Sequence, residues 1–378
     1  MIVTCVEDLR RLARRRVPKM FYDYADGGSW TESTYRANEA DLSKIHFRQR
    51  VCVNIEKRNL TTHLVGQEAA MPVALGPVGL CGMQHADGEI HAARAAQAFG
   101  VPYCLSTMSI CSIEDVAAHT NKPFWFQLYV MRDRVFVARL IERAQAANCS
   151  ALVVTLDLQI LGDRHHDARN GLSAPPKPTP RAMLDLLTKP RWSLAMLQTP
   201  RRQFGNIVGH VEGVSDMRSL SAWTESQFDP TMHWDDIAWI RRLWKGPLIL
   251  KGVMEPQDAQ RAVDVGADAI VVSNHGGRQL DGAPSTITVL PRIVDAVGDR
   301  IEVLFDSGVR NGQDVLRAVA LGARGVLLGR AYVYGLGAMG EAGVTHCLKF
   351  IEHELSLTMG FCGHTDINDV GRDILFDA

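Results

Sequence analysis

From residue 71 onward the chain alternates short apolar runs with stretches of helical periodicity. Apolar runs bounded by glycine or polar residues are typical of buried parallel strands, because helices cover such strands on both faces. The pattern predicts eight strands, at 72–76, 102–106, 124–129, 151–157, 247–251, 269–274, 301–306 and 325–329.

Amphipathic helical patterns follow these runs, at 89–99, 113–119, 135–147, 234–244, 256–265, 289–297, 314–321 and 344–357. Eight strands, each followed by a helix, is the count for a (β/α)8 TIM barrel. We therefore predict an α/β protein with a single domain. Residues 71–378 form its barrel, and residues 1–70, with short helices at 6–16 and 18–25, form an N-terminal helical cap.

One connection is much longer than the others. It is a loop of about residues 158–232, which separates the fourth strand from its helix. Loops of that length in a compact domain are usually functional. Its segment 181–202 mixes Leu, Met and Trp with Lys and Arg around one acid, Asp185, and Pro190 favours two short helices over one. A basic amphipathic segment can lie in a membrane interface, although a flap over the active site or an oligomer contact fits the same pattern.

A doubly wound dinucleotide-binding fold is the competing α/β arrangement, and the chain contains a literal GxGxxG at 335–340. That fingerprint belongs after an early strand, with an acid about 20 residues further on. Here it follows the last predicted strand, and no βαβ unit comes after it. We interpret the motif as small-residue packing before the final helix, not as a nicotinamide site.

Composition excludes several classes of protein. The 378 residues hold 41 Lys and Arg against 42 Asp and Glu, so the net charge of −1 does not indicate nucleic-acid binding. No apolar run is long enough to span a membrane, and the N-terminus lacks the apolar core of a secretory signal. The eight cysteines form no CxxC pair and lie mostly in apolar segments, which is typical of reduced thiols in a reducing compartment.

Polar or glycine-bearing positions follow every predicted strand, at the end of the barrel where such enzymes place their active sites. Polar groups in buried strands cost free energy without partners, so a bound ligand explains the whole set better than isolated core groups do. The set is Pro77, Gly79, Ser106, Gln127, Tyr129, Thr155, Asp157, Lys251, Ser273, His275, Arg278, Asp306, Gly308, Arg310, Gly329 and Arg330.

Three members of this set suit proton removal from a small acid. His275 exchanges a proton near neutral pH, and Asp157 can hold it as a base. Arg278 can grip a carboxylate with its two-pronged guanidinium group. Further groups suited to binding a 2-hydroxy carboxylate are Tyr24, Tyr129 and Arg164.

Other members suit a flat, phosphorylated cofactor. Barrels commonly bind phosphate after strands seven and eight, through backbone N–H groups and cations. The residues at that place are Gly308, Arg310, Gly329 and Arg330. A hydrogen-bonding ring for a heteroaromatic system can form from Ser106, Gln127, Thr155 and Lys251. Of these, Lys251 can stabilise negative charge on a reduced cofactor.

These stretches resemble the FMN-dependent 2-hydroxy acid dehydrogenase/oxidase family. The matching motifs are highly specific and span nearly the whole chain: PKMFYDY at 18–24, WFQLY at 125–129, SNHGGRQLD at 273–281, DSGVR at 306–310 and LGR at 328–330. Within the family the chain looks most like the bacterial flavin L-lactate dehydrogenase branch, through GPVG at 76–79, LST at 105–107 and FDP at 228–230.

The resemblance implies FMN as cofactor and oxidation of an (S)-2-hydroxy acid, above all L-lactate, to the 2-keto acid. Electrons then pass to an external acceptor, with quinone favoured over a soluble carrier or oxygen. The alternatives are a 2-hydroxy acid oxidase that uses oxygen and a mandelate-type dehydrogenase for larger acids. We also expect a cytoplasmic homotetramer, attached peripherally to the cytoplasmic face of the inner membrane through 181–202.

Roles carry over from the family onto the matching positions of this chain. The resemblance implies catalytic and substrate-binding roles for Tyr24, Tyr129, Asp157, Arg164, His275 and Arg278. It implies that FMN contacts Pro77, Val78, Gly79, Ser106, Gln127, Thr155, Lys251, Ser273, Asp306, Gly308, Arg310, Gly329 and Arg330.

Two positions depart from the family pattern near the substrate. Met108 stands where glycolate oxidase-like members have an aromatic residue, and Gly79 stands where many members have alanine. Both favour a side chain larger than that of glycolate. The adjacent His165 and His166 have no carboxylate motif to complete a metal site, so we expect no bound metal.

Overall fold

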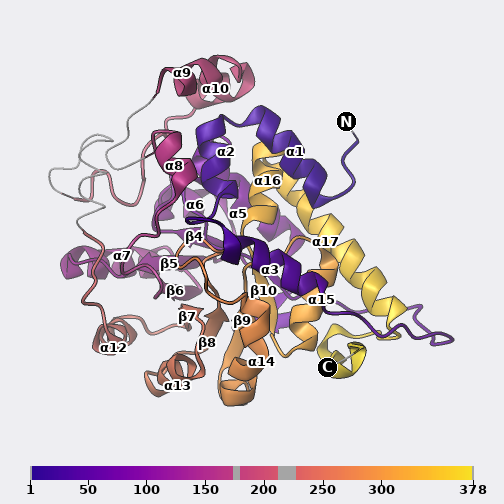
Figure 1. Cartoon of the computed structure of the whole chain (residues 1–378). Helices are drawn as coiled ribbons and strands as arrows, with labels where there is room; N and C mark the ends of the chain where they lie inside the picture. The colour runs from indigo at the N-terminus through magenta and orange to yellow at the C-terminus, as the bar shows by residue number, and fades with distance from the viewer. Residues whose placement is uncertain (1, 173–178, 212–226, 377–378) are drawn as a thin grey trace.

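A computed structural model describes residues 2–172, 179–211 and 227–376. Its centre is a parallel sheet of eight strands in the order β3-β10-β9-β8-β7-β6-β5-β4. An isolated parallel bridge between Leu75 and Tyr103 joins the two outer strands, so the sheet closes into a barrel (Figure 1). The predicted (β/α)8 fold is confirmed.

All eight predicted strands are present, within a few residues of their expected bounds. Their side chains are almost all buried, because helices cover the outside of the barrel and side chains fill its interior. The strands are β3 (Val73–Leu75), β4 (Cys104–Ser106), β5 (Trp125–Tyr129), β6 (Ala151–Thr155), β7 (Leu248–Val253), β8 (Ala269–Val272), β9 (Glu302–Phe305) and β10 (Gly325–Leu328).

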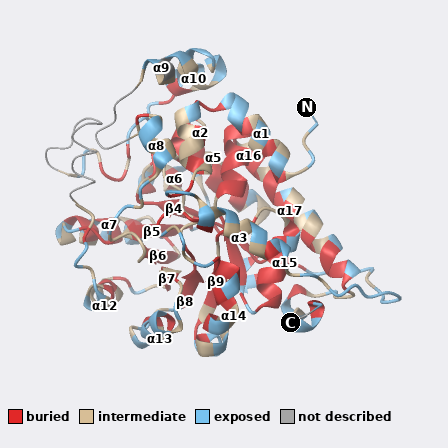
Figure 2. Cartoon of the chain, in the orientation of Figure 1, coloured by how far each residue is buried: buried red, intermediate tan, exposed pale blue. Residues whose placement is uncertain are grey.

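The predicted helices surround the sheet. Figure 2 shows their buried faces turned toward the barrel and their exposed faces turned outward, which is the arrangement that an amphipathic pattern produces. They are α5 (Gly88–Phe99), α6 (Ile113–His119), α7 (Arg134–Ala146), α12 (Trp234–Leu243), α13 (Pro256–Asp264), α14 (Thr286–Val297), α15 (Gly312–Ala320) and α17 (Glu341–Phe361).

The GxGxxG stretch forms the second half of α16 (Arg330–Met339) and ends at its C-cap, Gly340. The sequence did not predict this helix. A Cβ added at Gly335 would lie 2.3 Å from the carbonyl oxygen of Gly343 in α17. The glycines therefore let two helices approach closely, as the small-residue interpretation required. The short helix α4 (Cys81–Gln84) was also not predicted.

The N-terminal residues form α1 (Val6–Arg16) and α2 (Lys19–Asp26), as predicted, and a third helix, α3 (Ser33–Ser43), which was not. Side chains of this region are bound to the loop after β8. Asp281 accepts hydrogen bonds from the hydroxyl groups of Thr31 and Ser33, and Asn38 exchanges hydrogen bonds with Asn274. A small hairpin, β1 (Thr62–Leu64) and β2 (Gln67–Ala69), precedes the first barrel strand.

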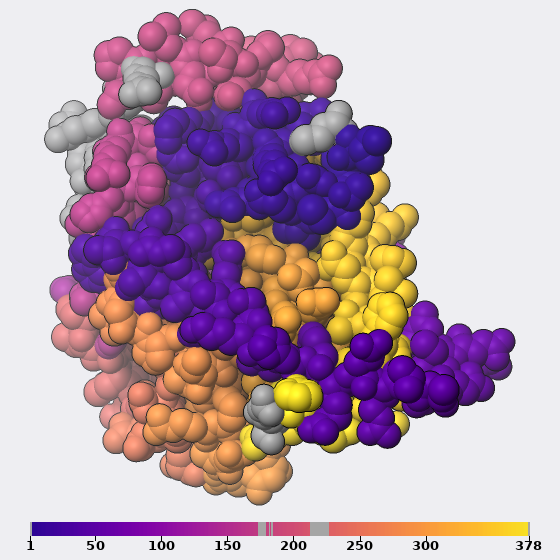
Figure 3. Space-filling view, turned by 45° about the vertical axis from the view of Figure 1, so that its right-hand side comes forward, coloured from indigo at the N-terminus to yellow at the C-terminus, as the bar shows by residue number. Residues whose placement is uncertain are grey.

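The long connection after β6 contains α8 (His165–Arg169), α9 (Pro180–Leu187) and α10 (Pro190–Gln198). Pro190 begins α10, so the prediction of two short helices is confirmed. Residues 173–178 and 212–226 of the predicted loop lie outside the described residues. Figures 1 and 3 show α9 and α10 as one layer over the N-terminal helices, at the top of the molecule.

Contacts from α10 and α9 reach the body of the protein. The Trp192 ring stacks on Phe21 at 5.5 Å between centroids, and its indole N–H donates to the Met83 carbonyl at 2.9 Å. Lys19 N donates to the Asp185 carboxylate at 2.6 Å, which ties α2 to α9. The outer faces of the two helices expose Leu184, Leu187, Leu194 and Leu197.

Two short 3-10 helices, at Ile367–Asp369 and Arg372–Ile374, end the described chain. All eight cysteines are free thiols, and six of them are buried. Within 2–172, 179–211 and 227–376, no helix is both long and apolar enough to cross a bilayer.

Candidate active site

A cavity of about 1160 Å³ lies at the C-terminal ends of the barrel strands. That volume exceeds the range of ordinary ligand cavities, about 300–1,000 Å³, so the cavity has room for more than one small molecule. The predicted site residues that line it are Tyr24, Pro77, Val78, Gly79, Tyr129, Arg164, Lys251, His275, Arg278, Asp306, Gly308, Arg310, Gly329 and Arg330.

Five predicted residues do not line this cavity: Ser106, Gln127, Thr155, Asp157 and Ser273. The Ser106 hydroxyl donates to Gln127 Oε1 at 3.1 Å, and the buried Nε2 of Gln127 has no hydrogen-bond partner in the described structure. A buried amide donor of that kind costs free energy unless something accepts its hydrogen bond.

His275 and Asp157 lie in direct contact. The Nδ1 atom of His275 is 3.0 Å from Asp157 Oδ1, and both side chains are largely buried. Burial lowers the pKa of His275 below its ordinary value, although Asp157 opposes that shift. Burial raises the pKa of Asp157, but the nearby His275 and Lys251 outweigh it and leave the pKa lowered. The neutral imidazole can therefore accept a proton and keep the resulting charge beside a carboxylate.

Lys251, within β7, is a cation whose charge acts on both members of this pair. Its ammonium group lies 2.9 Å from the Asp306 carboxylate and donates to the Ser273 hydroxyl at 2.8 Å. Burial lowers the pKa of Lys251, but Asp306 and Asp157 reverse that effect and raise the pKa above its ordinary value. The raised pKa keeps the ammonium group charged near neutral pH, at the wall of the cavity.

Two arginines, Arg278 and Arg164, also line the cavity. Arg278 donates from Nη1 to the carbonyl oxygens of Tyr24 and Gly27, and its guanidinium lies 4.7 Å from the centre of the Tyr24 ring. Arg164 donates from Nε to the Arg278 carbonyl at 3.3 Å. Burial, with Arg164 nearby, lowers the pKa of Arg278, so this pair of cations favours an anionic ligand between them. Burial raises the pKa of Tyr129, which keeps its phenol protonated as a donor.

Arg330 and Arg310 lie where the last two strands end. Arg330 donates to the carbonyls of Ala25, Gly27 and Gly276, at 3.0, 2.9 and 2.9 Å. The Arg310 guanidinium is paired with Glu39 at 2.7 Å. Next to them, a Cβ added at Gly329 would meet nothing closer than Val78 at 3.9 Å, so the backbone there is open to a ligand. Open backbone beside two cations is suited to a phosphate group.

One carboxylate of the cavity was missed by sequence reasoning. Asp167, in α8, lines the cavity, and its Oδ2 atom lies 3.8 Å from Arg164 Nη1. Burial raises the pKa of Asp167 above its ordinary value, against the effect of the two arginines Arg278 and Arg164. The sequence did offer a signal for this residue, because Asp167 follows Arg164 by three positions, a spacing that brings two side chains together on a helix. Apolar residues also line the cavity, among them Phe21, Leu80, Met83, Ile110, Leu161 and Phe204.

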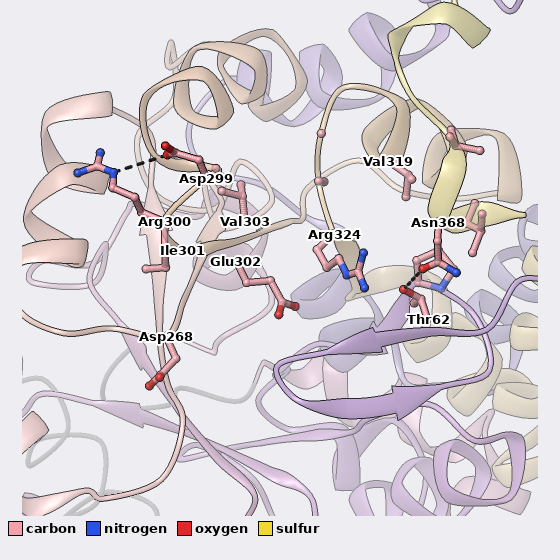
Figure 4. A pocket seen from close by; sticks show the side chains of 16 residues that line it. Thr62, Asp268, Asp299, Arg300, Ile301, Glu302, Val303, Val319, Arg324 and Asn368 are labelled. Atoms are coloured by element: carbon pink, nitrogen blue, oxygen red, sulfur yellow. Dashed lines mark hydrogen bonds and ion pairs between the residues drawn. The ribbon is translucent and has the colours of Figure 1, made fainter.

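A second cavity, of about 570 Å³, lies at the opposite end of the barrel (Figure 4). Its polar groups already have protein partners. Glu302 accepts from Val65 N at 2.9 Å, Arg324 donates to the His63 carbonyl at 3.1 Å, and Thr62 donates to Asn368 at 2.8 Å. Because their hydrogen bonds are satisfied, these groups stabilise the closed end of the barrel.

The fold and the cavity define a barrel enzyme, and the chain belongs to the FMN-dependent dehydrogenase family, whose profile matches residues 13–377. It is 48% identical over 377 residues to an L-lactate dehydrogenase of Caulobacter vibrioides, an alignment that covers 99% of this chain and 98% of the relative. It is 46% identical over 380 residues to an L-lactate dehydrogenase of Pseudomonas syringae pv. syringae, with 100% of both chains covered.

Solved structures resemble the whole chain as well. The monotopic membrane protein (S)-mandelate dehydrogenase is 36% identical with a TM-score of 0.95, and the match covers 100% of both chains. A mandelate oxidase is 35% identical with a TM-score of 0.84, over 99% of this chain and 98% of the other. The predicted family, enzyme class and FMN cofactor are confirmed.

The residues of the cavity and of the strand ends behind it fit FMN. The unpaired Gln127 amide needs an acceptor, and a flavin ring edge carries carbonyl oxygens. Lys251 holds a positive charge beside the cavity, where a reduced ring accumulates negative charge. The open backbone at Gly329 lies beside Arg330, which suits the FMN phosphate.

Proposed function

We propose that the protein oxidises L-lactate to pyruvate with FMN and passes the electrons to an external acceptor, with quinone favoured. The observation that carries this proposal is that His275, held from behind the cavity wall by Asp157, lines the same cavity as the arginine pair Arg278 and Arg164. Removing the hydroxyl proton of a 2-hydroxy acid requires a base, and holding its carboxylate requires cations. The relatives named L-lactate dehydrogenase support the choice of substrate.

The side chains have distinct proposed roles. Arg278 and Arg164 bind the substrate carboxylate, and the phenols of Tyr24 and Tyr129 donate hydrogen bonds to the substrate. Because Nδ1 of His275 is held by Asp157, its Nε2 atom is the one that takes the hydroxyl proton.

Asp157 then lies beside the charged imidazolium and stabilises it. FMN, when bound, supplies the acceptor for the two electrons that leave the substrate with the hydrogen on Cα.

The proposed FMN site extends from Lys251 to the two arginines Arg310 and Arg330. Lys251 and Gln127 would hold the ring, and the groups that follow β9 and β10 would hold the phosphate. The other residues proposed to contact or support FMN are Pro77, Val78, Gly79, Ser106, Thr155, Ser273, Asp306, Gly308 and Gly329.

A larger 2-hydroxy acid, oxidised by a mandelate-type dehydrogenase, is the second candidate substrate. The observation that favours it is that apolar side chains, among them Ile110 and Leu161, line the cavity and could contact a larger substrate side chain. A Cβ at Gly79 would come within 3.1 Å of the Tyr24 hydroxyl, so glycine leaves extra room here. The solved relatives named for mandelate also support it.

An anaerobic reduction screen distinguishes these functions. The FMN-loaded protein is mixed with L-lactate, D-lactate, glycolate or (S)-mandelate, and bleaching of the flavin absorbance is followed over time. The proposal expects L-lactate to bleach the flavin fastest. Reoxidation with oxygen or with a soluble quinone analogue then separates an oxidase from a dehydrogenase. No bleaching by any of these acids would contradict the proposal.

We further propose peripheral attachment to the cytoplasmic face of the inner membrane, with α9 and α10 as the docking layer. Leu184, Leu187, Leu194 and Leu197 are 58–78% exposed there, and Arg191 is exposed among them. Apolar side chains with neighbouring cations suit the surface of an anionic bilayer. One structural relative is described as a monotopic membrane protein. A quinone acceptor in the bilayer would then lie close to the flavin.

The basic residues of this segment do not all face outward. Arg201 is paired with Asp87 at 3.1 Å and with Asp115 at 2.7 Å, so its charge stabilises the loop. Lys189 donates to the Arg15 carbonyl at 3.0 Å. Apolar insertion therefore contributes more to the proposed docking than charge does.

Liposome sedimentation tests the docking layer. The double variant Leu194→Gln and Leu197→Gln should pellet less with anionic vesicles than the parent protein. The matched control changes two exposed apolar residues elsewhere, Val135 and Leu357, to Gln. Point substitutions are preferable to deleting the segment, because Trp192 packs against Phe21 at the cavity. Equal pelleting of all three proteins would contradict the proposal.

We also propose that the whole chain acts as one domain, with 1–70 as cap, and assembles as a homotetramer. The supporting surface is a projecting segment, 48–59, that lies beside the end of α17 (Figure 3). Val51 and Phe361 are 74% and 62% exposed there, and assembly would bury them. Sedimentation velocity should give four chain masses, and Phe361→Ser with Val51→Ser should shift the protein toward smaller species.

A further inference from the structure

Glu89, near the start of α5, is an acid with no exposed surface, and it lines neither cavity. Its carboxylate accepts hydrogen bonds from the backbone N–H groups of Ile110 at 2.9 Å and Cys111 at 3.4 Å. A carboxylate removed from water is costly unless donors surround it, so these bonds are the reason it can remain there. They join α5 to the segment 107–111.

The segment 107–111 forms one wall of the active-site cavity. It follows β4 directly, and its Met108 and Ile110 side chains line the cavity. Thr107 and Ser109 turn to the protein, where their hydroxyls donate to the carbonyls of Gln127 and Cys111, each at 2.6 Å. The apolar side chains that face the substrate therefore depend on the backbone of the segment for their position.

A second wall segment meets the first one at Glu89. Leu80 N, at the start of α4, donates to the Met108 carbonyl at 3.0 Å, and Leu80 and Met83 line the same cavity. A Cβ added at Gly82 would lie 2.6 Å from Ile110 Cβ and 3.0 Å from Glu89 Oε2. The two segments thus pack against each other with the buried carboxylate at their junction.

We propose that Glu89 is a positioning residue that holds Met108 and Ile110 in place and thereby sets which substrate side chains the cavity accepts. The inference rests on the proposed function, in which the cavity binds a 2-hydroxy acid. Glu89 touches none of His275, Asp157 or Arg278, which come from the ends of β6 and β8. Its effect therefore falls on substrate side-chain selection and not on the proton transfer.

Glu89→Gln is the sharpest test, because it keeps the shape of the side chain and removes one acceptor. The carboxamide nitrogen then faces a backbone N–H donor, so one hydrogen bond to the segment is lost. Glu302→Gln is the matched control. Glu302 is a half-buried carboxylate that also accepts a backbone hydrogen bond, from Val65, but it lies at the other end of the barrel.

Binding is measured on the FMN-loaded proteins, by titrating pyruvate, 2-ketohexanoate and phenylglyoxylate against the flavin absorbance. We expect Glu89→Gln to change the ratio of affinities for the smallest and largest ligand by about tenfold, the size typical of altered apolar pocket contacts. Glu302→Gln should leave that ratio unchanged. Thermal unfolding of both variants measures the purely structural loss, and kcat with L-lactate should change less than the affinity ratio does.

A Glu89→Gln protein that unfolds earlier but keeps the parent's affinity ratio would overturn the inference. If that variant does not accumulate as a folded flavoprotein, Glu89→Asp keeps the charge but shortens its reach, and it should shift the ratio in the same direction. An unchanged ratio in Glu89→Asp would likewise overturn it. Because the ligands are not turned over, failure of the parent protein to oxidise L-lactate would contradict only the proposed function.

Discussion

His275 Nδ1 lies 3.0 Å from Asp157 Oδ1, although 118 positions separate the two residues in the chain. The contact forms because β6 and β8 end at the same rim of the barrel, on either side of β7. It places the proposed base between a carboxylate and the cavity, and the consequences of that arrangement can be measured.

Replacing His275 by Gln should slow flavin reduction by L-lactate about 10²–10⁴-fold, the usual cost of losing a general base. Asp157→Asn should slow it by a smaller factor, because the amide oxygen can still accept from Nδ1 but no longer balances the imidazolium charge. Anaerobic stopped-flow absorbance measures both rates. Near-parental reduction by His275→Gln would remove His275 from its proposed role.

The rate of flavin reduction should depend on pH through His275. Burial lowers the pKa of His275, so the neutral form that accepts a proton predominates above that lowered pKa. The rate should therefore stay level near neutral pH and fall as pH drops through a value below the ordinary histidine pKa of about 6.5. In Asp157→Asn the fall should move to still lower pH, since Asp157 raises the pKa of His275. A fall at higher pH in that variant would contradict the assignment.

Arg278→Lys should weaken substrate binding and slow the reaction together. A lysine keeps the charge but cannot bind a carboxylate with two parallel hydrogen bonds, and it cannot hold the carbonyls of Tyr24 and Gly27 in the same way. We expect kcat/KM for L-lactate to fall about 10²-fold, the scale typical of a misplaced substrate. Arg300→Lys, at the opposite cavity, is the control and should leave kinetics unchanged.

Arg330→Ala should weaken FMN binding about tenfold or more, on the scale of one lost charge-assisted hydrogen bond. The guanidinium also holds the carbonyls of Ala25, Gly27 and Gly276, so the N-terminal cap should loosen too. Fluorescence titration of the apoprotein with FMN gives the dissociation constant. Arg324→Ala is the control, because it removes an arginine that also donates to a backbone carbonyl, that of His63. It should leave the dissociation constant for FMN unchanged. Equal FMN affinity in the two variants would show that the phosphate lies elsewhere.

Asp306→Asn should destabilise the protein, because it leaves the buried Lys251 ammonium without its closest carboxylate. Breaking a buried pair from one side typically costs about 3–5 kcal/mol in the free energy of unfolding. The pKa of Lys251, which Asp306 raises, should fall in the variant. Chemical denaturation provides the measurement. Asp268→Asn, which breaks a more exposed pair with Arg241, should cost much less.

Local pattern was sufficient for the regular parts of the fold. Every barrel strand was predicted because its residues are apolar throughout, and the outer helices were predicted because burial on one face imposes a period of 3.6 residues. The cavity residues at the strand ends could also be named, since polar groups that follow buried strands must meet at one rim. The break at Pro190 was predicted because proline ends the preceding helical hydrogen bonds.

Elements without such a pattern were missed. The helix α3 packs through polar contacts such as Asn38 with Asn274, which leave no apolar period to detect. The helix α16 begins at Arg330 and is rich in glycine, and its stability comes from close packing on α17. In both cases tertiary contacts outweighed local propensity.

The sequence by itself determined the order of the strands along the chain and the family, and it predicted most of the polar groups that line the cavity. Only the tertiary structure decided which groups touch: His275 with Asp157, Lys251 with Asp306, and Glu89 with the backbone of Ile110. The physical reason is that hydrogen bonds and ion pairs act over about 3 Å, whereas these partners are 21 to 118 positions apart in the chain. The closure of the barrel alone brings them within that distance.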